Sequence, residues 1–266
     1  MNMTRNRPDV TADGTLGRPP LHSAGASTSV VRAVWRVLLM WRFRLFQRHR
    51  YRRLAIEEVA GRPFLVLPEV FNPKLFRTGE LLARAVNTAM VPAGSTVLDV
   101  GTGSGAAAVV AAARARRVVA VDLNPHAVRC ARINAILNGV DDRVDVRHGD
   151  LFGPVRGERF DLVLFNPPYF YGSPQDPLER AFKSTDVAER FAAGLPAHLT
   201  AHGRALILLS TDGVAHRFLD ALAAQRFAVR PLTRRDLRSE IVTIYEVSLT
   251  PAVALVGAST VDADPL

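Results

Sequence analysis

A glycine-rich turn between a short apolar segment and an alanine-rich segment constrains the fold of this chain most strongly. Residues 96–100 read TVLDV, residues 101–105 read GTGSG, and residues 106–115 are mostly alanine. Glycines let the backbone turn sharply and approach a ligand closely, and the N-terminus of the helix that follows offers N–H groups and a positive dipole end. The pattern predicts a strand, a ligand-binding turn and a helix, which together form one unit of an α/β sheet.

Acidic residues stand at the ends of three predicted strands. Asp99 lies near the end of the first, and Asp122 ends the strand 117–121, 23 residues after Asp99. An acid at this spacing can accept hydrogen bonds from both ribose hydroxyls of a nucleoside ligand. Asp150 follows the predicted strand 143–147 and would suit an adenine amino group.

The glycine spacing alone leaves two kinds of ligand open. Gly101, Gly103 and Ala106 also match the pattern of a dinucleotide-binding turn. Asp99 argues against NAD, because a carboxylate directly before the glycines suits an ammonium group better than a pyrophosphate. With the other two acids it favours a cationic adenosyl ligand without phosphates, S-adenosylmethionine.

A second motif follows the apolar run 160–165, which predicts a buried parallel strand. Asn166-Pro167-Pro168-Tyr169 comes next, and two prolines cannot continue a sheet ladder because they lack N–H donors. The chain therefore leaves the sheet at the carboxyl end of the strand, where open α/β sheets bind ligands. An Asn amide, backbone carbonyls and an aromatic face suit a planar amide or amine nitrogen.

The remaining periodicity predicts alternating strands and helices over residues 57–250, a single α/β domain. We expect a hairpin-like entry at 62–71, helices at 80–90, 125–138, 186–199 and 214–225, a turn starting at Gly203, and strands at 205–209, 227–231 and 241–249.

The N-terminal region carries the basic charge. The net charge is +9, and between residues 14 and 56 there are nine arginines and no acid. We predict a disordered tail at 1–29, a basic amphipathic helix at 30–56 and a frayed tail at 251–266. Residues 30–53 could pack on the domain, or could bind an anionic surface such as RNA, the ribosome or a membrane.

The sequence also argues against a disulfide-stabilised, metal-binding or membrane-spanning protein. Cys130 is the only cysteine, which excludes an internal disulfide and favours a reducing, cytoplasmic location. No His/Cys cluster suggests a metal, so we expect none. The apolar run in residues 37–41 is too short to span a bilayer, and Arg36 interrupts any signal-peptide core.

The four motifs in order, DVGTGSG, AVDLNP, GDLF and NPPY, resemble class I S-adenosylmethionine-dependent methyltransferases. Among these the chain is most similar to the HemK type, the glutamine N5-methyltransferases of peptide release factors. The resemblance covers about residues 70–249 and implies a Rossmann-like, seven-stranded sheet with helices on both faces.

The resemblance also implies roles for individual residues. The glycines would pass the methionine part of the cofactor, with Asp99 near it, while Asp122 would bind the ribose. Residues 78–80 match a segment that lies over the cofactor, except that Gly79 replaces a threonine. The implied cofactor-binding residues are Asp99, Gly101, Thr102, Gly103, Gly105, Asp122, Leu123, Asp150, Leu151 and Asn166.

The implied catalytic residues are Asn166, Pro167, Pro168 and Tyr169. Asn166 and the carbonyl of Pro167 would hold the target nitrogen, and Tyr169 would shape the slot. We therefore expect an N-methyltransferase whose substrate is a protein glutamine. The alternatives are adenine-N6 or guanine-N2 methylation of RNA or DNA, which the basic extension would suit, and methylation of a small molecule.

Overall fold

The computed structural model of the chain describes residues 53–75, 78–86, 90–168, 170–171, 183–211, 213, 215–237 and 240–250. The predicted tails at 1–29 and 251–266 lie outside these residues, as does nearly all of the predicted basic helix at 30–56. Tyr169 of the second motif also lies outside them.

A seven-stranded sheet forms the centre of the molecule, with the strand order β10-β11-β9-β6-β3-β4-β5. Five neighbouring strands are parallel, and β11 and β10 join antiparallel at one edge. The strands are β3 (Thr96–Val100), β4 (Arg117–Asp122), β5 (Val144–His148), β6 (Phe160–Phe165), β9 (Leu199–Ser210), β10 (Phe227–Asp236) and β11 (Ile241–Leu249). The predicted Rossmann-like fold class is confirmed.

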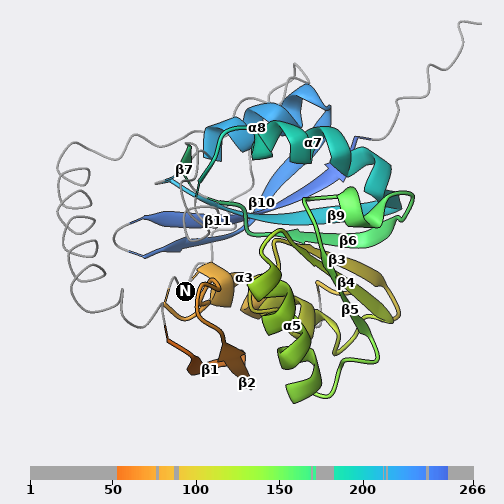
Figure 1. Cartoon of the computed structure of the whole chain (residues 1–266). Coiled ribbons are helices and arrows are strands. Elements are labelled where there is room, and N and C mark those ends of the chain that lie inside the picture. Colours follow the sequence, from red (N-terminus) through yellow and green to blue (C-terminus); the bar gives the residue numbers. More distant parts are fainter. Residues whose placement is uncertain are drawn as a thin grey trace, which may run out of the picture.

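Helices cover both faces of this sheet (Figure 1). On one face lie α3 (Thr78–Ala85), α4 (Ala106–Ala111) and α5 (Pro125–Leu137), and on the other α7 (Val187–His198) and α8 (Ala215–Ala224). A short 3-10 helix, η2 (Gly153–Val155), precedes β6. Because the central strands are buried on both faces, β4 and β6 are almost continuously apolar instead of alternating.

A hairpin precedes the sheet, as predicted, but it begins earlier in the chain than expected. Its strands β1 (Ala55–Val59) and β2 (Arg62–Val66) pair antiparallel through a turn at Ala60 and Gly61, which both have positive φ. Since Ala55 already pairs with Val66, β1 crosses the predicted domain boundary between residues 56 and 57. A second small pairing joins β7 (Phe170–Tyr171) to β8 (Lys183–Ser184) in parallel.

Five predicted elements are corrected. The strand predicted at 205–209 begins at Leu199, and the strand predicted at 227–231 continues to Asp236. The helix predicted at 80–90 begins at Thr78 and ends at Ala85, and the helix predicted at 106–115 ends at Ala111 in turns. Gly203 does not start a turn but lies inside β9, where the register against β6 shifts. A Cβ atom on Gly203 would lie 2.6 Å from the carbonyl oxygen of Phe160, so only glycine fits this irregularity.

Three further features of the described residues bear on function. Cys130 is buried in the small core under the hairpin, where its thiol donates a hydrogen bond to the carbonyl of Leu65 at 3.2 Å. Within the ranges that the structure describes, no helix is long and apolar enough to span a membrane. Nor do these residues bring three His, Cys, Asp or Glu side chains together as metal ligands.

Candidate cofactor and substrate site

Both sequence motifs lie at the carboxyl ends of the central strands β3 and β6, at the point where the strand order reverses. The chain runs from β3 outward to β4 and β5 and then returns to β6 on the other side of β3. Val100 pairs with Val121 of β4 and with Phe165 of β6, so the glycine-rich turn and Asn166 leave the sheet side by side. Open α/β sheets bind their ligands in the crevice at this reversal.

The glycine-rich turn takes a conformation that only glycine adopts easily. Gly101, Gly103 and Gly105 have φ values of 64°, 57° and 82°. The amide of Thr102 donates to the carbonyl of Val121 at 3.0 Å, which holds the turn against β4. At Gly101 the nearest atom to an added Cβ is a ring carbon of Phe165, 3.8 Å away, so the turn borders the end of β6.

Asp99 lies beneath this turn and is almost fully buried. Its Oδ2 accepts hydrogen bonds from the hydroxyl of Thr102 at 2.6 Å and from the amide of Ala108 at 3.1 Å. Burial raises the pKa of Asp99 to about 7. The two hydrogen-bond donors lower this pKa, and the nearby charge of Asp122 raises it. A buried carboxyl poised between its two protonation states can respond to a cation bound next to it.

Asp122, at the end of β4, contacts the glycine-rich turn from the other side. Its Oδ2 accepts from the amide of Gly103 at 2.8 Å, and its Oδ1 accepts from the amide of Asn124 at 2.8 Å. Burial raises its pKa, while these N–H donors and the charge of His148 oppose that effect. Each oxygen keeps a second lone pair, so the fixed carboxylate can still accept two ribose hydroxyls.

Asp150 and Leu151 border an open cleft of about 850 Å³, which Gly149 also lines. The amide of Gly149 donates a hydrogen bond to the carbonyl of Asp122 at 2.9 Å, so the cleft adjoins the end of β4. The carboxylate of Asp150 pairs with the guanidinium of Arg190 on α7, which also lines the cleft. Leu151 has a φ of 46°, and Leu123 is 46% exposed at the end of β4. Nε2 of His148, which also lines the cleft, lies 2.9 Å from the carbonyl oxygen of Leu123, so Leu123 lies close to the cleft that Asp150 and Leu151 border.

Asn166 and the two prolines extend directly from the end of β6. Asn166 and Pro168 are half-buried, and Pro167 is buried. Their backbone forms no strand, as two prolines require. The structure thus brings the described part of the second motif to the glycine-rich turn, on the side of β6 and β9.

Residues 71–75, which sequence reasoning did not single out as part of the site, lie over the glycine-rich turn. Phe71 is the nearest neighbour of a Cβ placed on Gly103, at 3.7 Å. Buried Asn72 shapes this segment, because its Oδ1 accepts from the amides of Lys74 and Leu75 at 2.9 and 3.0 Å. An Asn directly before a Pro is a turn signal that could have drawn attention to the segment.

The segment 71–75 also explains why Gly79 stands where HemK-type methyltransferases have a threonine. A Cβ on Gly79 would lie 2.9 Å from Cβ of Pro73 and 3.1 Å from the ring of Phe71. The segment therefore fills the space that a threonine side chain would need. Next to it, the hydroxyl of Thr78 is buried and has no hydrogen-bond partner within the described residues.

Asn134 of α5 is the other residue that sequence reasoning missed. It is completely buried and donates to the carbonyls of Leu65 at 2.7 Å and Ser104 at 2.8 Å, while its Oδ1 accepts from the amide of Leu65 at 2.8 Å. It fastens the glycine-rich turn to the hairpin. A polar residue on the apolar face of a predicted helix was the available signal.

The donor set fits S-adenosylmethionine. The carboxylates of Asp99 and Asp122 could accept hydrogen bonds from an ammonium and from ribose hydroxyls, and the positive-φ glycines leave room between them. The buried hydroxyl of Thr78 has no hydrogen-bond partner among the described residues and could bind a polar group of the cofactor. Asp99 and Asp122 would hold the polar parts of the cofactor, and Asp150 and Leu151 would border its base. The cofactor supplies an electrophilic methyl group.

Several relatives of known sequence are similar to this chain. A protein of Methanocaldococcus jannaschii, named as a candidate protein N5-glutamine methyltransferase, is 32% identical over 165 residues, which cover 59% of this chain and 80% of that protein. The release factor glutamine methyltransferase of Cereibacter sphaeroides is 34% identical over 162 residues, 55% of this chain and 56% of its own. The ribosomal protein uL3 glutamine methyltransferase of Bradyrhizobium diazoefficiens is 33% identical over 165 residues, 54% of this chain and 51% of its own. The chain thus spans only about half the length of the two bacterial relatives.

A solved structure with the same fold is the 16S rRNA guanine-N2 methyltransferase of Thermus thermophilus, in complex with AdoMet and guanosine. It superimposes with a TM-score of 0.58 at 21% identity, over 74% of this chain and 50% of that chain. At this identity the likeness concerns the fold. The family model of the methyltransferase small domain matches residues 62–229, and the chain belongs to this family of S-adenosylmethionine-dependent methyltransferases.

Proposed function

We propose that this protein transfers a methyl group from S-adenosylmethionine to the side-chain amide nitrogen of a glutamine in a protein. The observation that carries the proposal is the position of Asn166 and Pro167 beside the glycine-rich turn, at the reversal of the strand order. The names of the relatives in M. jannaschii, C. sphaeroides and B. diazoefficiens support glutamine as the acceptor.

The chemistry asks the protein mainly to position the amide. In the proposed complex the side-chain oxygen of Asn166 and the carbonyl of Pro167 accept the two amide hydrogens of the glutamine. This turns the nitrogen lone pair toward the methyl group. A bond forms between nitrogen and the methyl carbon, the carbon–sulfur bond breaks, and one amide proton passes to solvent. Such alignment alone can lower a barrier by several kcal/mol, on the order of 7–11 in well-oriented systems.

Asn166 also supports the transition state electrostatically. As the nitrogen gains the methyl group it becomes positively charged, and its N–H groups then become stronger donors. Carbonyl oxygens fixed in a buried setting stabilise this charge without reorganising, as they would have to in water. Pro167 is buried, which suits such a fixed acceptor. The transfer requires no general base.

The relatives differ in the protein that carries the methylated glutamine. The two bacterial relatives are named for different substrates, a release factor and ribosomal protein uL3, at nearly equal identity. Both names point to the translation machinery, so we propose a translation protein in the cytoplasm as the substrate. The arginine-rich residues 30–53 would hold an anionic surface of that substrate or of its complex, and this role lies outside the described residues.

A labelling experiment tests the proposal. The full-length protein is incubated with methyl-labelled S-adenosylmethionine and a cell extract, and the products are divided between protease and nuclease treatment. We expect protease-sensitive label, and N5-methylglutamine after complete enzymatic digestion to amino acids. Label that disappears with nuclease would replace the proposal with adenine or guanine methylation, and label in small solutes would replace it with small-molecule methylation.

The variant Asn166→Ala separates chemistry from cofactor binding. Calorimetry should give nearly the wild-type affinity for S-adenosylmethionine, because the cofactor is held mainly by the acids of β3 and β4. Turnover should fall roughly 100-fold or more, as expected when one fixed polar partner of a transition state is removed. Asn138→Ala is the matched control, because Asn138 caps the far end of α5. Wild-type turnover in Asn166→Ala would contradict the mechanism.

A further inference from the structure

A small groove lies between α3 and the β10–β11 hairpin, on the sheet face that α4 and α5 cover. Its volume is about 250 Å³. Leu81 and Ala85 of α3 form one wall, and Thr233 and Arg235 of β10 form the other. The apolar floor comes from Leu208, Val242 and Ile244 in the neighbouring strands.

The groove lies at the same end of the sheet as the catalytic crevice, where the parallel strands have their carboxyl ends. Leu208 lies near the carboxyl end of β9, and Val242, which pairs with Ser210, lies at the adjoining end of β11. These strands follow β6 in the sheet, so the groove is on the side of Asn166 that faces away from the cofactor acids. The β10–β11 hairpin projects past the rest of the sheet on this side (Figure 1).

The α3 wall also connects the groove to the site. The first turn of α3 contains Gly79, which packs against Pro73 and Phe71, and Phe71 borders Gly103. The groove residues Leu81 and Arg84 follow one turn later on the same helix. A chain lying in the groove could therefore reach the crevice within a few residues, since each extended residue spans roughly 3.3 Å.

Two arginines flank the apolar floor. Arg84 and Arg235 line opposite walls, and both are exposed. Glu80 pairs with Arg84 at 2.8 Å but also with Lys74 at 2.9 Å, so one carboxylate is shared between two cations. A ligand that offers an apolar side chain together with a carboxylate would match both the floor and the walls.

We propose that this groove docks the protein substrate by an apolar side chain next to an acidic residue, close in sequence to the methylated glutamine. The proposal rests on the proposed function, because it names the recognition surface of the same site. A polypeptide is favoured over a nucleic acid, because the described lining of the groove is apolar and includes no aromatic side chain on which a base could stack. The apolar lining residues are Leu81, Ala85, Leu208, Val242 and Ile244.

Charge reversal tests the docking surface. The variants are Arg235→Glu alone and Arg84→Glu with Arg235→Glu. The matched control is Arg234→Glu, because Arg234 is exposed on the same strand but alternates to the opposite face. The probes are fluorescein-labelled synthetic peptides with one glutamine and a Leu-Glu pair at successive offsets, with a Leu-Lys set for comparison. Binding is followed by anisotropy in full-length protein saturated with S-adenosylhomocysteine.

We expect at least one Leu-Glu peptide to bind about tenfold or more tightly than its Leu-Lys counterpart. Arg235→Glu should weaken this binding severalfold, and the double variant tenfold or more. Arg234→Glu should leave it unchanged, and all variants should bind S-adenosylmethionine as the wild type does. Equal peptide binding by the double variant would overturn the proposal. Absence of any preference for Leu-Glu peptides, or poly(U) binding that the same reversal abolishes, would also overturn it.

The outcome for docking and the outcome for the proposed function are separable. If extract labelling yields N5-methylglutamine and the groove variants leave the KM of the extract substrate unchanged, docking at the groove is wrong and the function stands. If peptide binding depends on Arg84 and Arg235 but no methylglutamine forms, the function is wrong and the binding surface stands.

Discussion

The amide of Gly103 donates a hydrogen bond to Oδ2 of Asp122 at 2.8 Å. This contact joins the glycine-rich turn after β3 to the end of β4. The amide of Asn124 donates to Oδ1 of the same carboxylate at 2.8 Å, so both of its oxygens are held. The residue predicted to bind the ribose is therefore already oriented by the turn predicted to pass the methionine part.

Replacing Asp122 with alanine should weaken cofactor binding strongly. The variant removes the proposed ribose acceptor and leaves the amides of Gly103 and Asn124 without their partner. Hydrogen bonds to a charged group contribute about 1.5–3 kcal/mol each, so we expect S-adenosylmethionine affinity to fall by about 10- to 100-fold. Calorimetry measures this directly. Asp141→Ala is the control, because Asp141 is exposed after α5. An affinity within twofold of wild type in Asp122→Ala would refute the ribose role.

Asp99 should make both stability and cofactor affinity depend on pH. Burial raises its pKa to about 7 in the folded protein, from 3.8 for an exposed aspartate. Between these values the folded state binds more protons than the unfolded state, so the free energy of unfolding should decrease as pH rises through this window. A bound ammonium favours the carboxylate, so S-adenosylmethionine should bind more tightly at about pH 8 than at about pH 6.

The variant Asp99→Asn isolates this carboxyl from the other titrating groups. Its amide oxygen can still accept from Ala108, but it carries no charge at any pH. Denaturant titrations between about pH 5 and 8 should show a flatter stability profile for Asp99→Asn than for wild type. The difference in cofactor affinity between about pH 6 and 8 should also shrink. Identical pH profiles for the two proteins would assign the dependence to another group.

Two glycines with similar backbone conformations should respond differently to alanine. Gly105 and Gly139 have φ values of 82° and 64°, so either substitution strains the backbone by roughly 1–2 kcal/mol. At Gly139 no atom lies within 4 Å of an added Cβ, whereas at Gly105 the Cβ and Cα of Ala131 lie 3.0 and 3.1 Å away. Overpacking costs about 1–3 kcal/mol more. Urea unfolding should therefore show a larger loss for Gly105→Ala, and equal losses would mean that α5 can move away.

Local signals explain which parts of the fold could be predicted from sequence. Apolar runs predicted β3, β4 and β6, because a strand buried on both faces has no polar alternation to obscure it. The glycines and the double proline predicted where the chain leaves the sheet, since both effects arise within a few residues. Helix ends were less well predicted, because Ala106–Ala111 stops within an alanine-rich run that has no stop signal of its own.

Contacts between distant segments could not be predicted in this way. Arg190 and Asp150 are 40 residues apart, and only the packing of α7 beside η2 brings them together. Gly194 permits that packing, since an added Cβ would lie 2.5 Å from the ring of Phe152. Asn134 reaches Leu65 across 69 residues, and its sequence signal was only its place on an apolar helix face. Such residues support the site without belonging to any motif.

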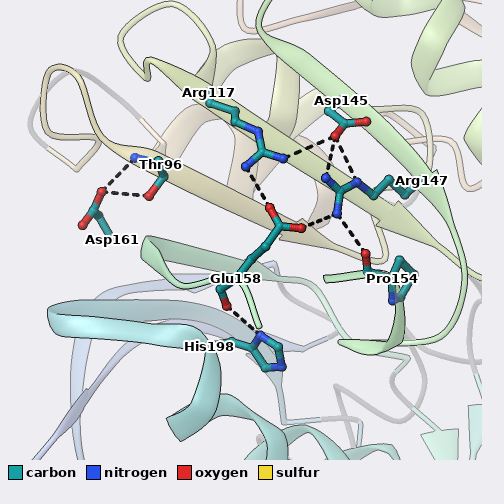
Figure 2. A network of polar contacts seen from close by, with 8 residues as sticks. All are labelled: Thr96, Arg117, Asp145, Arg147, Pro154, Glu158, Asp161 and His198. Atoms are coloured by element: carbon teal, nitrogen blue, oxygen red, sulfur yellow. Dashed lines mark hydrogen bonds and ion pairs between the residues drawn. The ribbon is translucent and has the colours of Figure 1, made fainter. Parts of the chain in front are cut away.

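The charged network around Glu158 should stabilise the fold without affecting the cofactor site. Glu158 pairs with Arg117 at 2.8 Å and with Arg147, and Arg147 pairs with Asp145 at 2.8 Å, which joins β4, β5 and the segment before β6 (Figure 2). Burial alone would raise the pKa of Glu158, but the two arginines together lower it. A carboxyl with a lowered pKa stabilises the fold above its unfolded pKa, near 4.5, and loses that contribution as pH falls through its folded value.

Glu158→Gln should therefore lower the free energy of unfolding by about 1 kcal/mol at neutral pH, and by less at about pH 4 or in high salt. The half-exposed arginines limit the size of this effect. The matched control is Glu58→Gln, because Glu58 is exposed on the outer face of β1 and should not contribute. Urea titrations measure stability, and calorimetry should show unchanged S-adenosylmethionine affinity, since no member of the network belongs to the glycine-rich turn. A weaker affinity in Glu158→Gln would mean that the network positions β4, and with it Asp122, for the cofactor.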